Sequence, residues 1–171
     1  MVNDRNMSKA HLHTPIGWIA LQEEQGSLIA AIFLDDEPNT DDIALSPALE
    51  NYLQEMRSYF EGNIEAFASL AHYAQPGTDF QQKVWQQLTV IPYGKTISYR
   101  ELAIRLGDEK CIRAAASANG QNNLAIIIPC HRVIGSDGSL TGYAGGLWRK
   151  KWLLEHEARY SGKAVQSSLG F

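Results

Sequence analysis

The sequence predicts an α+β protein with two domains. Apolar runs rich in β-forming residues lie at residues 14–21 and 27–34, and helical apolar spacing recurs through the rest of the chain. The charge also changes sign along the chain: residues 1–78 carry 3 basic and 12 acidic side chains, a net charge of −9, whereas residues 79–171 carry 12 and 7, a net charge of +5. The turn sequence Gln75-Pro76-Gly77 stands at that change. We therefore predict domains at residues 1–76 and 77–171.

The composition excludes several classes of protein. With 171 residues, 44% of them hydrophobic and 20% charged, the chain has ordinary globular composition. Its apolar runs are shorter than the roughly 18 residues that a membrane span needs, and its polar start lacks the apolar core of a secretory signal. We expect a cytoplasmic protein without membrane contact. Two cysteines, Cys111 and Cys130, with no CxxC pair, favour neither a disulfide framework nor a zinc site, so we expect no metal and no cofactor.

The first domain is predicted to hold a β-hairpin followed by a helix. After a polar start that we expect to be an irregular tail, the two β-rich runs flank residues 23–26, which end in a glycine. Residues 35–42 are acidic and predict a loop. Ser46 and Pro47 then predict a helix start, and Gly62 its end, with an apolar stripe of Leu49, Leu53, Met56 and Phe60.

The second domain is predicted to begin with three helices. Thr78 and Gln81 form a capping-box pattern, and the helix that follows is closed by Pro92. Ser98 and Glu101 form a second such pattern, which starts a short helix ending at Gly107. A third helix is expected near residues 110–121. Two short helices joined by a tight turn outline a helix-turn-helix, a pattern that many helical proteins share.

The third helix consists almost entirely of small residues. It either packs very closely on a neighbour or presents a shallow face to something flat. Arg113 favours the second interpretation, because Ala116, Ser117 and Gly120 share its face at i+3, i+4 and i+7, so one long cation stands on a shallow surface. Such a face suits groove binding with insertion at a base step, and a basic half-chain suits a polyanion. The alternative for the charge pattern is two solvated surfaces without special purpose.

Cys130 is the candidate nucleophile. It follows Ile126-Ile127-Ile128, which predicts a short buried strand, and Pro129, which stiffens the backbone. A free thiol has a pKa of about 8.5, so a basic neighbour must promote the thiolate, and His131 and Arg132 are candidates. Because adjacent strand residues point to opposite faces, we expect Cys130 and His131 to touch only through a turn or a bridging water. A Cys-His pair is by pattern alone more often structural than catalytic.

Glu157 is the candidate third member of the site. In a helix over residues 147–159 it shares the inward face with Leu153 and Leu154 near the helix C-terminus, where a buried anion needs a partner. His131 would complete a Cys-His-acid relay. The alternative is that Glu157 reaches solvent or a lysine. We expect Trp148 and Trp152 in the core, Cys111 as a small buried residue, and surface or loop positions for the other histidines.

The segment Ile128-Pro129-Cys130-His131-Arg132-Val133 resembles the O6-alkylguanine-DNA alkyltransferase family. The resemblance continues in the expected order over most of residues 79–160. It includes Ser98-Tyr99, the alanine-rich residues 113–120, the loop 142–146 and the segment 151–157.

This resemblance implies an N-terminal α/β roll of ribonuclease-H-like type and a mostly helical C-terminal domain that holds the site and a helix-turn-helix. The implied activity is DNA repair: direct, irreversible, stoichiometric transfer of a methyl or other alkyl group from O6-alkylguanine to Cys130, with O4-alkylthymine as a candidate second substrate. Such a suicide methyltransferase flips the damaged base out of double-stranded DNA from the minor groove and acts once per molecule. We expect a monomer without an obligate protein partner.

The resemblance also implies residue roles. Arg113 fills the gap left by the flipped guanine, and Tyr99 assists rotation of the nucleotide. His131 and Glu157 activate Cys130 through a water, and Asn122 braces the turn beside it. The remaining DNA-contacting residues are Ser98, Ala114 and Ala116, and the loop residues against the base are Tyr143, Ala144 and Gly145.

Two departures from the family pattern bear on the function. Many relatives follow the bracing asparagine with proline, whereas this chain has Asn122-Asn123-Leu124-Ala125, which leaves the pocket width open. Two cysteines exclude the four-cysteine regulatory module of some relatives. The rival functions are a lesion sensor, which in this family lacks the cysteine, and a cysteine hydrolase, which would give the alanine-rich helix no role.

Overall fold

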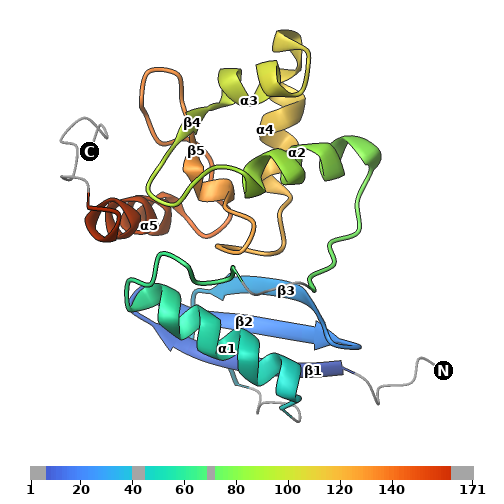
Figure 1. Ribbon diagram of the computed structural model, residues 1–171, viewed down its shortest axis with the longest axis vertical. Helices are drawn as coiled ribbons and strands as arrows, with labels where there is room; N and C mark the ends of the chain where they lie inside the picture. Colours follow the sequence, from blue (N-terminus) through green and yellow to red (C-terminus); the bar gives the residue numbers. More distant parts are fainter. Residues whose placement is uncertain (1–6, 40–44, 69–71, 163–171) are drawn as a thin grey trace. The chain divides into compact units, whose positions relative to one another are not determined.

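The computed structural model describes residues 7–39, 45–68 and 72–162. Their internal contacts define two compact units, whose elements are labelled in Figure 1. Unit 1 holds the described residues up to Gln75 together with Asn123–Ala125, and unit 2 holds residues 76–122 and those from Ile126 onward. Three residues that the sequence assigns to the second domain therefore belong to unit 1. A boundary after residue 76 between independently folding domains stays a prediction.

Unit 1 is built on an antiparallel sheet in the order β1-β2-β3, with β1 at Met7–Thr14, β2 at Gly17–Glu24 and β3 at Ser27–Leu34. Gln25 and Gly26 connect β2 to β3 with φ angles of 52° and 85°, as a two-residue hairpin turn between twisted strands requires. The predicted hairpin is confirmed, with a shorter turn than expected.

The prediction of an irregular tail is wrong for strand β1. Only one of its four inward side chains is large and apolar, so their alternation is a weak sequence pattern; the four are Ser8, Ala10, Leu12 and Thr14. Pairing with β2 runs along the whole strand, from Met7↔Glu24 to Thr14↔Gly17, and satisfies the backbone groups that face β2. Tertiary pairing, and not intrinsic preference, makes this segment a strand.

Helix α1 (Pro47–Phe60) begins and ends as predicted and lies along the sheet in Figure 1. The Ser46 hydroxyl caps it by accepting the N–H of Leu49 at 3.0 Å. Within α1, the Tyr52 hydroxyl donates to the carbonyl oxygens of Gly26 and His72. The buried face of α1 consists of Leu49, Tyr52, Leu53, Met56 and Tyr59, so Tyr59 takes the place predicted for Phe60. The acidic loop predicted at 35–42 lies partly outside the described residues.

The second edge of β3 is covered by two short segments. Leu28 forms a parallel bridge with Tyr73, and Ala31 forms one with Leu124. The N–H of Ala31 donates to the Asn123 carbonyl at 2.8 Å, and the N–H of Ala125 donates to the Ala31 carbonyl at 3.0 Å. We call Asn123–Ala125 the strap, because it leaves the chain of unit 2, pairs with β3 and returns.

Unit 2 is mostly helical. The first helix, α2, has both reciprocal hydrogen bonds of the predicted capping box, and the Ser98 hydroxyl caps α3 by accepting the Glu101 N–H at 3.0 Å. A two-stranded parallel sheet joins the short strands β4 (Ile97–Ser98) and β5 (Val133–Ile134). The predicted α+β class with a helical second part is confirmed. The helices of the unit are α2 (Asp79–Thr89), α3 (Tyr99–Arg105), α4 (Ile112–Gly120) and α5 (Leu147–Tyr160).

Several local predictions in unit 2 are wrong. Residues 126–128 form a turn and no strand, because the preceding strap, and not this isoleucine run, supplies the sheet pairing. Trp148 is 56% exposed and outside the core, and Cys111 is only half-buried. His156, expected at the surface or in a loop, is buried and stacks on Trp152 with ring centroids 4.7 Å apart.

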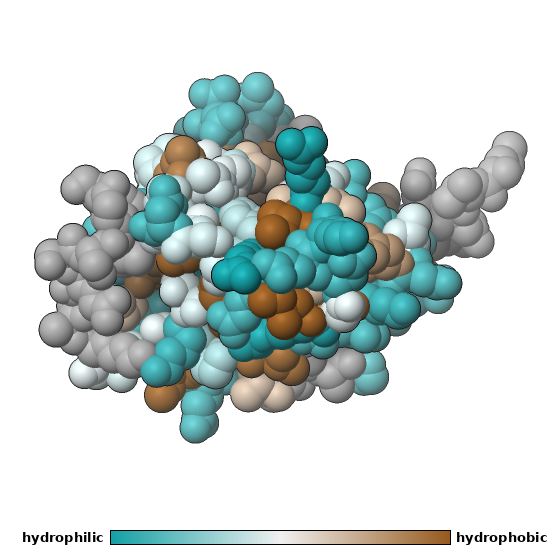
Figure 2. Space-filling view, turned by 90° about the horizontal axis from the view of Figure 1, so that it is seen from above, coloured by the Kyte–Doolittle hydropathy of each residue, from teal (hydrophilic) through white to brown (hydrophobic). Residues whose placement is uncertain are grey.

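The visible surface in Figure 2 shows hydrophobic residues scattered among hydrophilic ones, without one dominant apolar patch. None of the helices in the described part of the chain is long and apolar enough to cross a membrane. Across residues 7–39, 45–68 and 72–162, no group of three or more His, Cys, Asp or Glu side chains is placed to hold a metal ion.

Candidate active site

Cys130 begins a short 3₁₀ helix, Cys130–Arg132, directly after the turn at residues 126–129. Its side chain is 6% exposed, and its N–H donates to the Ile128 carbonyl at 2.8 Å. Ile126 enters the turn with φ 73°, a region that is unfavourable for a β-branched residue. Surrounding contacts therefore hold the chain in this shape against its local preference, as is common near functional sites.

Two asparagines at the end of α4 fix the cysteine. Asn122 Nδ2 lies 2.7 Å from the Ile128 carbonyl oxygen and 3.2 Å from Sγ of Cys130. Asn119 Nδ2 donates to the Cys130 carbonyl oxygen at 3.3 Å. The Asn122 amide thus braces the turn and also offers an N–H to the sulfur.

Glu157, from α5, is fully buried and bonded to two residues of the 3₁₀ helix. Its Oε1 lies 2.7 Å from His131 Nε2, and Arg132 donates to the carboxylate through Nε and Nη2, both at 2.9 Å. Burial alone would raise the pKa of Glu157, but His131 and Arg132 outweigh it and lower that pKa. The ionised carboxylate and the guanidinium compensate each other, as a buried charge requires.

His131 is a neutral imidazole in this setting. Burial lowers its pKa and outweighs the opposing effect of Glu157. Because Nε2 faces a carboxylate, we assign the ring proton to Nε2, which leaves a lone pair on Nδ1. Among the described residues Nδ1 has no hydrogen-bond partner, although it is buried. A buried acceptor without a partner is costly, and this one is available to take a proton.

The resting sulfur is a thiol. Burial raises the pKa of Cys130, against the opposing influence of the Asn122 N–H and the charge of Lys150. The sequence-based expectation that its neighbours promote a thiolate is therefore wrong for the resting protein. For Cys130 to act as a nucleophile, its sulfur must therefore first lose this proton or lose it as it reacts.

Lys150 joins Tyr99 to the loop before α5. Its fully buried ammonium lies 3.1 Å from the Thr141 carbonyl oxygen, 3.2 Å from that of Gly142 and 3.4 Å from the Tyr99 hydroxyl. The Tyr99 hydroxyl itself donates to the Thr141 carbonyl at 3.0 Å. Burial lowers the pKa of Lys150 to about 8 and raises that of Tyr99, so near neutral pH a mostly protonated amine faces a neutral phenol.

The loop at residues 142–146 has the shape that its glycines permit. Gly142 and Gly146 have φ angles of 60° and 91°, and Arg149 Nη1 donates to the Gly145 carbonyl at 2.9 Å. Burial raises the pKa of Tyr143 well above its usual value, so its hydroxyl remains protonated. Ala144 is exposed.

The small residues of helix α4 serve both predicted purposes: close packing on one side and a shallow exposed face on the other. Ala115 and Ala118 are buried, and Trp85 Nε1 donates to the Ala118 carbonyl at 2.9 Å, so one side packs closely. On the other side Arg113 and Ala114 are exposed and Ala116 is half-buried.

Sequence reasoning missed Lys150 and Asn119 as members of this cluster. Lys150 lies in the run Arg149-Lys150-Lys151, which looks like a solvated charged face. The spacing argument used for Glu157 would have found it, because Leu153, Leu154 and Glu157 follow it at i+3, i+4 and i+7.

A buried thiol followed in the chain by a neutral histidine, which a paired carboxylate orients, defines the class of proteins with a cysteine nucleophile. The short helices α3 and α4 follow each other closely in the same unit, as in the predicted helix-turn-helix. The family model for the 6-O-methylguanine DNA methyltransferase DNA-binding domain matches residues 79–159. The methylated-DNA–protein-cysteine methyltransferase of Methanosarcina barkeri is 42% identical over 150 residues, which cover 85% of this chain and 94% of that protein. The chain belongs to the methylated-DNA–protein-cysteine methyltransferase family.

Other relatives extend this similarity to structures. The constitutive enzyme of Bacillus subtilis is 39% identical over 158 residues, 88% of this chain and 94% of that protein. The crystal structure of Mycobacterium tuberculosis O6-methylguanine methyltransferase has a TM-score of 0.77 at 36% identity, covering 95% of this chain and 98% of that one. The same organism's OGT in complex with DNA has a TM-score of 0.76 at 38% identity, covering 89% and 93%.

Proposed function

We propose that the protein repairs double-stranded DNA by direct transfer of a methyl or other alkyl group from O6 of guanine to Sγ of Cys130. The observation that carries this proposal is the position of Cys130, held by Asn122 and next in the chain to the buried His131–Glu157 pair, in a member of this family. The thioether product has no ready hydrolytic route, so the transfer is irreversible and each molecule acts once. O4-alkylthymine is the second candidate substrate.

We propose a proton and electron balance that starts from the resting protonation states of Cys130, His131 and Glu157. As the S–C bond forms, the thiol proton passes to His131 Nδ1, directly or through a water, and Glu157 stabilises the resulting imidazolium. The electron pair of the breaking C–O6 bond goes to the guanine, which leaves as a neutral base after taking a proton from Tyr99. This donation leaves a phenolate on Tyr99, which the adjacent ammonium of Lys150 stabilises and can reprotonate, while the imidazolium of His131 returns its proton to solvent. This series of reaction steps needs no cofactor.

The same proposal assigns a DNA surface to α3 and α4. Base flipping is required because the O6 substituent lies inside the base stack, and we infer approach from the minor groove with Arg113 inserted in the vacated space. Ala114 and Ala116 keep the face low, and Ser98 caps the helix that carries Tyr99. The loop residues Tyr143, Ala144 and Gly145 hold the flipped base. We propose a monomeric protein whose residues 77–171 form the catalytic and DNA-binding domain.

The test is mass spectrometry of the whole protein after incubation with a duplex that contains O6-methylguanine. We expect a single added methyl group, located on Cys130, and no addition for Cys130→Ser. Cys111→Ser is the matched control and should react like the wild type. Repeated turnover of the DNA would instead favour a hydrolase, and binding without transfer would favour a lesion sensor.

A further inference from the structure

The strap connects the acceptor site to the sheet of unit 1. Its central residue, Leu124, is fully buried, and both flanking residues bond to Ala31 of β3. The chain enters the strap directly from Asn122 and leaves it into Ile126, which starts the turn before Cys130. Both ends of the strap are therefore covalently continuous with the residues that hold the sulfur.

Gln75 is the side chain that fixes the start of the strap. Its Oε1 accepts the backbone N–H of Asn123, and its side chain is 7% exposed. The backbone before it is itself fixed, because the N–H of Ala74 donates to the Leu28 carbonyl at 3.0 Å and the N–H of Leu28 donates to the His72 carbonyl at 3.1 Å. Gln75 thus ties the strap to a rigid part of unit 1.

The position of the strap affects the sulfur through the single peptide group that joins Asn123 to Asn122. Asn123 and Asn122 share that peptide, and the Asn122 amide makes both the 2.7 Å bond to Ile128 and the 3.2 Å contact to Sγ. A shift of a few tenths of an ångström at Asn123 changes the direction of the Asn122 side chain, and hydrogen bonds weaken steeply with poor alignment.

We propose that Gln75 is a positioning residue for alkyl transfer, acting through the strap and Asn122 on the sulfur of Cys130. This inference rests on the proposed function, and it makes unit 1 a contributor to the chemistry of the site in addition to its role in the fold. The Asn122 N–H is the first of the influences that oppose the effect of burial on the thiol, so its loss disfavours the charge that develops on sulfur.

The experiment compares three variants in a Cys111→Ser background. Gln75→Met keeps the side-chain length and removes the acceptor, and Gln75→Glu keeps an acceptor. Ser46→Ala removes other hydrogen bonds of unit 1, those of the Ser46 hydroxyl to Glu23 and to the Leu49 N–H, which involve neither the strap nor the backbone before Gln75. Two quantities are measured: the single-turnover transfer rate at saturating methylated duplex, and the pH midpoint of Cys130 alkylation by iodoacetamide, which needs no DNA.

For Gln75→Met we expect a ~3- to 10-fold slower transfer, the order set by one lost hydrogen bond, with unchanged affinity for undamaged duplex and a higher pH midpoint. Gln75→Glu should restore both quantities to near wild type. Ser46→Ala should lower the melting temperature without changing the rate or the midpoint, which separates positioning from general loss of stability.

An unchanged midpoint and rate in folded Gln75→Met would overturn the inference, as would equal losses in Ser46→Ala. If the wild type fails to take a methyl group from DNA, the proposed function fails. A shifted iodoacetamide midpoint in Gln75→Met would still support the positioning role in that case.

Discussion

At the acceptor sulfur, burial and hydrogen bonding act in opposite directions. Burial favours the neutral thiol of Cys130, while Asn122 and Lys150 favour the anion. A thiol that ionises only as its proton reaches His131 is protected from reaction with stray electrophiles in water. Under the proposed function, we expect Cys130 to ionise only when the damaged nucleobase lies beside it.

A pH profile tests this proton path. Because burial holds the pKa of His131 below its ordinary value of about 6.5, the imidazole remains a base in mildly acidic solution. We expect the single-turnover transfer rate at saturating DNA not to rise between pH 6.5 and pH 8 and to fall at lower pH, as His131 takes up a proton. Above pH 8 the rate should also fall, because Lys150, whose pKa burial lowers to about 8, loses its proton.

The opposite profile would contradict the proton path. If the reaction instead required thiolate formed in advance, the rate would rise about tenfold per pH unit up to the raised pKa of Cys130. The free energy of unfolding must be measured over the same pH range, because unfolding at low pH would also lower the transfer rate. His131 and Glu157 both have lowered pKa values in the folded state, so the unfolded chain binds protons first and stability is lost as the pH falls through their ordinary values.

The sequence predicts the orientation of a single side chain correctly where helical spacing sets that orientation, and incorrectly where an irregular backbone sets it. The inward position of Glu157 follows from Leu153 and Leu154. The relation between Cys130 and His131 was argued from a strand, whereas the two residues lie in a 3₁₀ helix. No local sequence pattern predicts the positive φ of Ile126, because only the surrounding contacts impose it.

At the scale of elements, α4 has one side that packs against the protein interior and one side that is exposed. Its inner alanines allow the helix to approach α2, where Trp85 bonds to its backbone. Its outer side offers a shallow surface with the long side chain of Arg113. The small residues therefore serve both the interior and the surface of one helix.

Replacement of Arg113 by alanine tests the outer side. We expect repair of methylated duplex to slow by roughly 10- to 100-fold, because inserting the arginine offsets an unstacking cost of a few kcal/mol. Reaction with the free base O6-methylguanine, which needs no flipping, should change little. Single-turnover rates on both substrates give the comparison.

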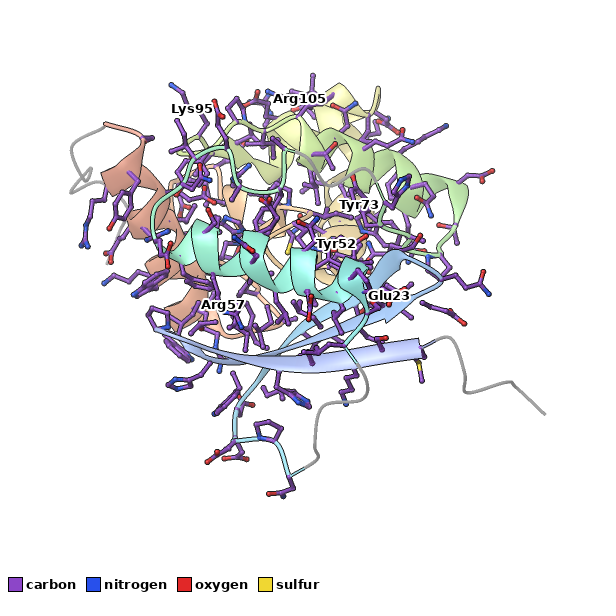
Figure 3. The ribbon with its side chains drawn as sticks, turned by 60° about the horizontal axis from the view of Figure 1, so that its bottom comes forward. Glu23, Tyr52, Arg57, Tyr73, Lys95 and Arg105 are labelled. Atoms are coloured by element: carbon purple, nitrogen blue, oxygen red, sulfur yellow. The ribbon has the colours of Figure 1, made fainter. Side chains whose placement is uncertain are left out.

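Arg105→Ala is the charge-matched control for this variant. Arg105, labelled in Figure 3, lies on α3 and pairs with Glu101 at 2.7 Å. Its loss removes the same charge from unit 2 and should affect both substrates slightly. Equal losses on duplex and free base in Arg113→Ala would indicate that Arg113 supports the fold.

The helices were predictable as elements because their ends are chemically marked. Ser46, Thr78 and Ser98 each accept a backbone N–H as caps, and these bonds depend on neighbours within four residues. Strand β1 and the strap depend on partners distant in the sequence. The isoleucines at 126–128 have strong β preference but no strand beside them, so they form a turn.

For the whole molecule, we expect the separation of charge along the chain to govern its electrostatic binding to DNA. Residues 79–171 carry a net charge of +5, although the whole protein has a net charge of −4. Binding to the DNA backbone releases counterions in proportion to the phosphates neutralised, so local charge matters more than the sum.

Salt dependence of binding tests this charge separation. For an undamaged duplex we expect log K to fall with log salt concentration with a slope of about −4, the order for four or five phosphate contacts. Arg57→Ala, at an exposed position of α1 in the acidic half, should leave the slope unchanged (Figure 3). A slope near zero, or one that changes with Arg57, would show that the basic half does not make the contact.

The sequence by itself determined the fold class, the hairpin, the helix ends and the residues Cys130, His131 and Glu157, because periodicity, caps and a short motif are encoded locally. Only the tertiary structure decided that the strap joins the sheet of unit 1, that Lys150 is buried beside Tyr99 and that the resting sulfur is a thiol. These features depend on burial and on partners distant in the chain, which no local pattern contains.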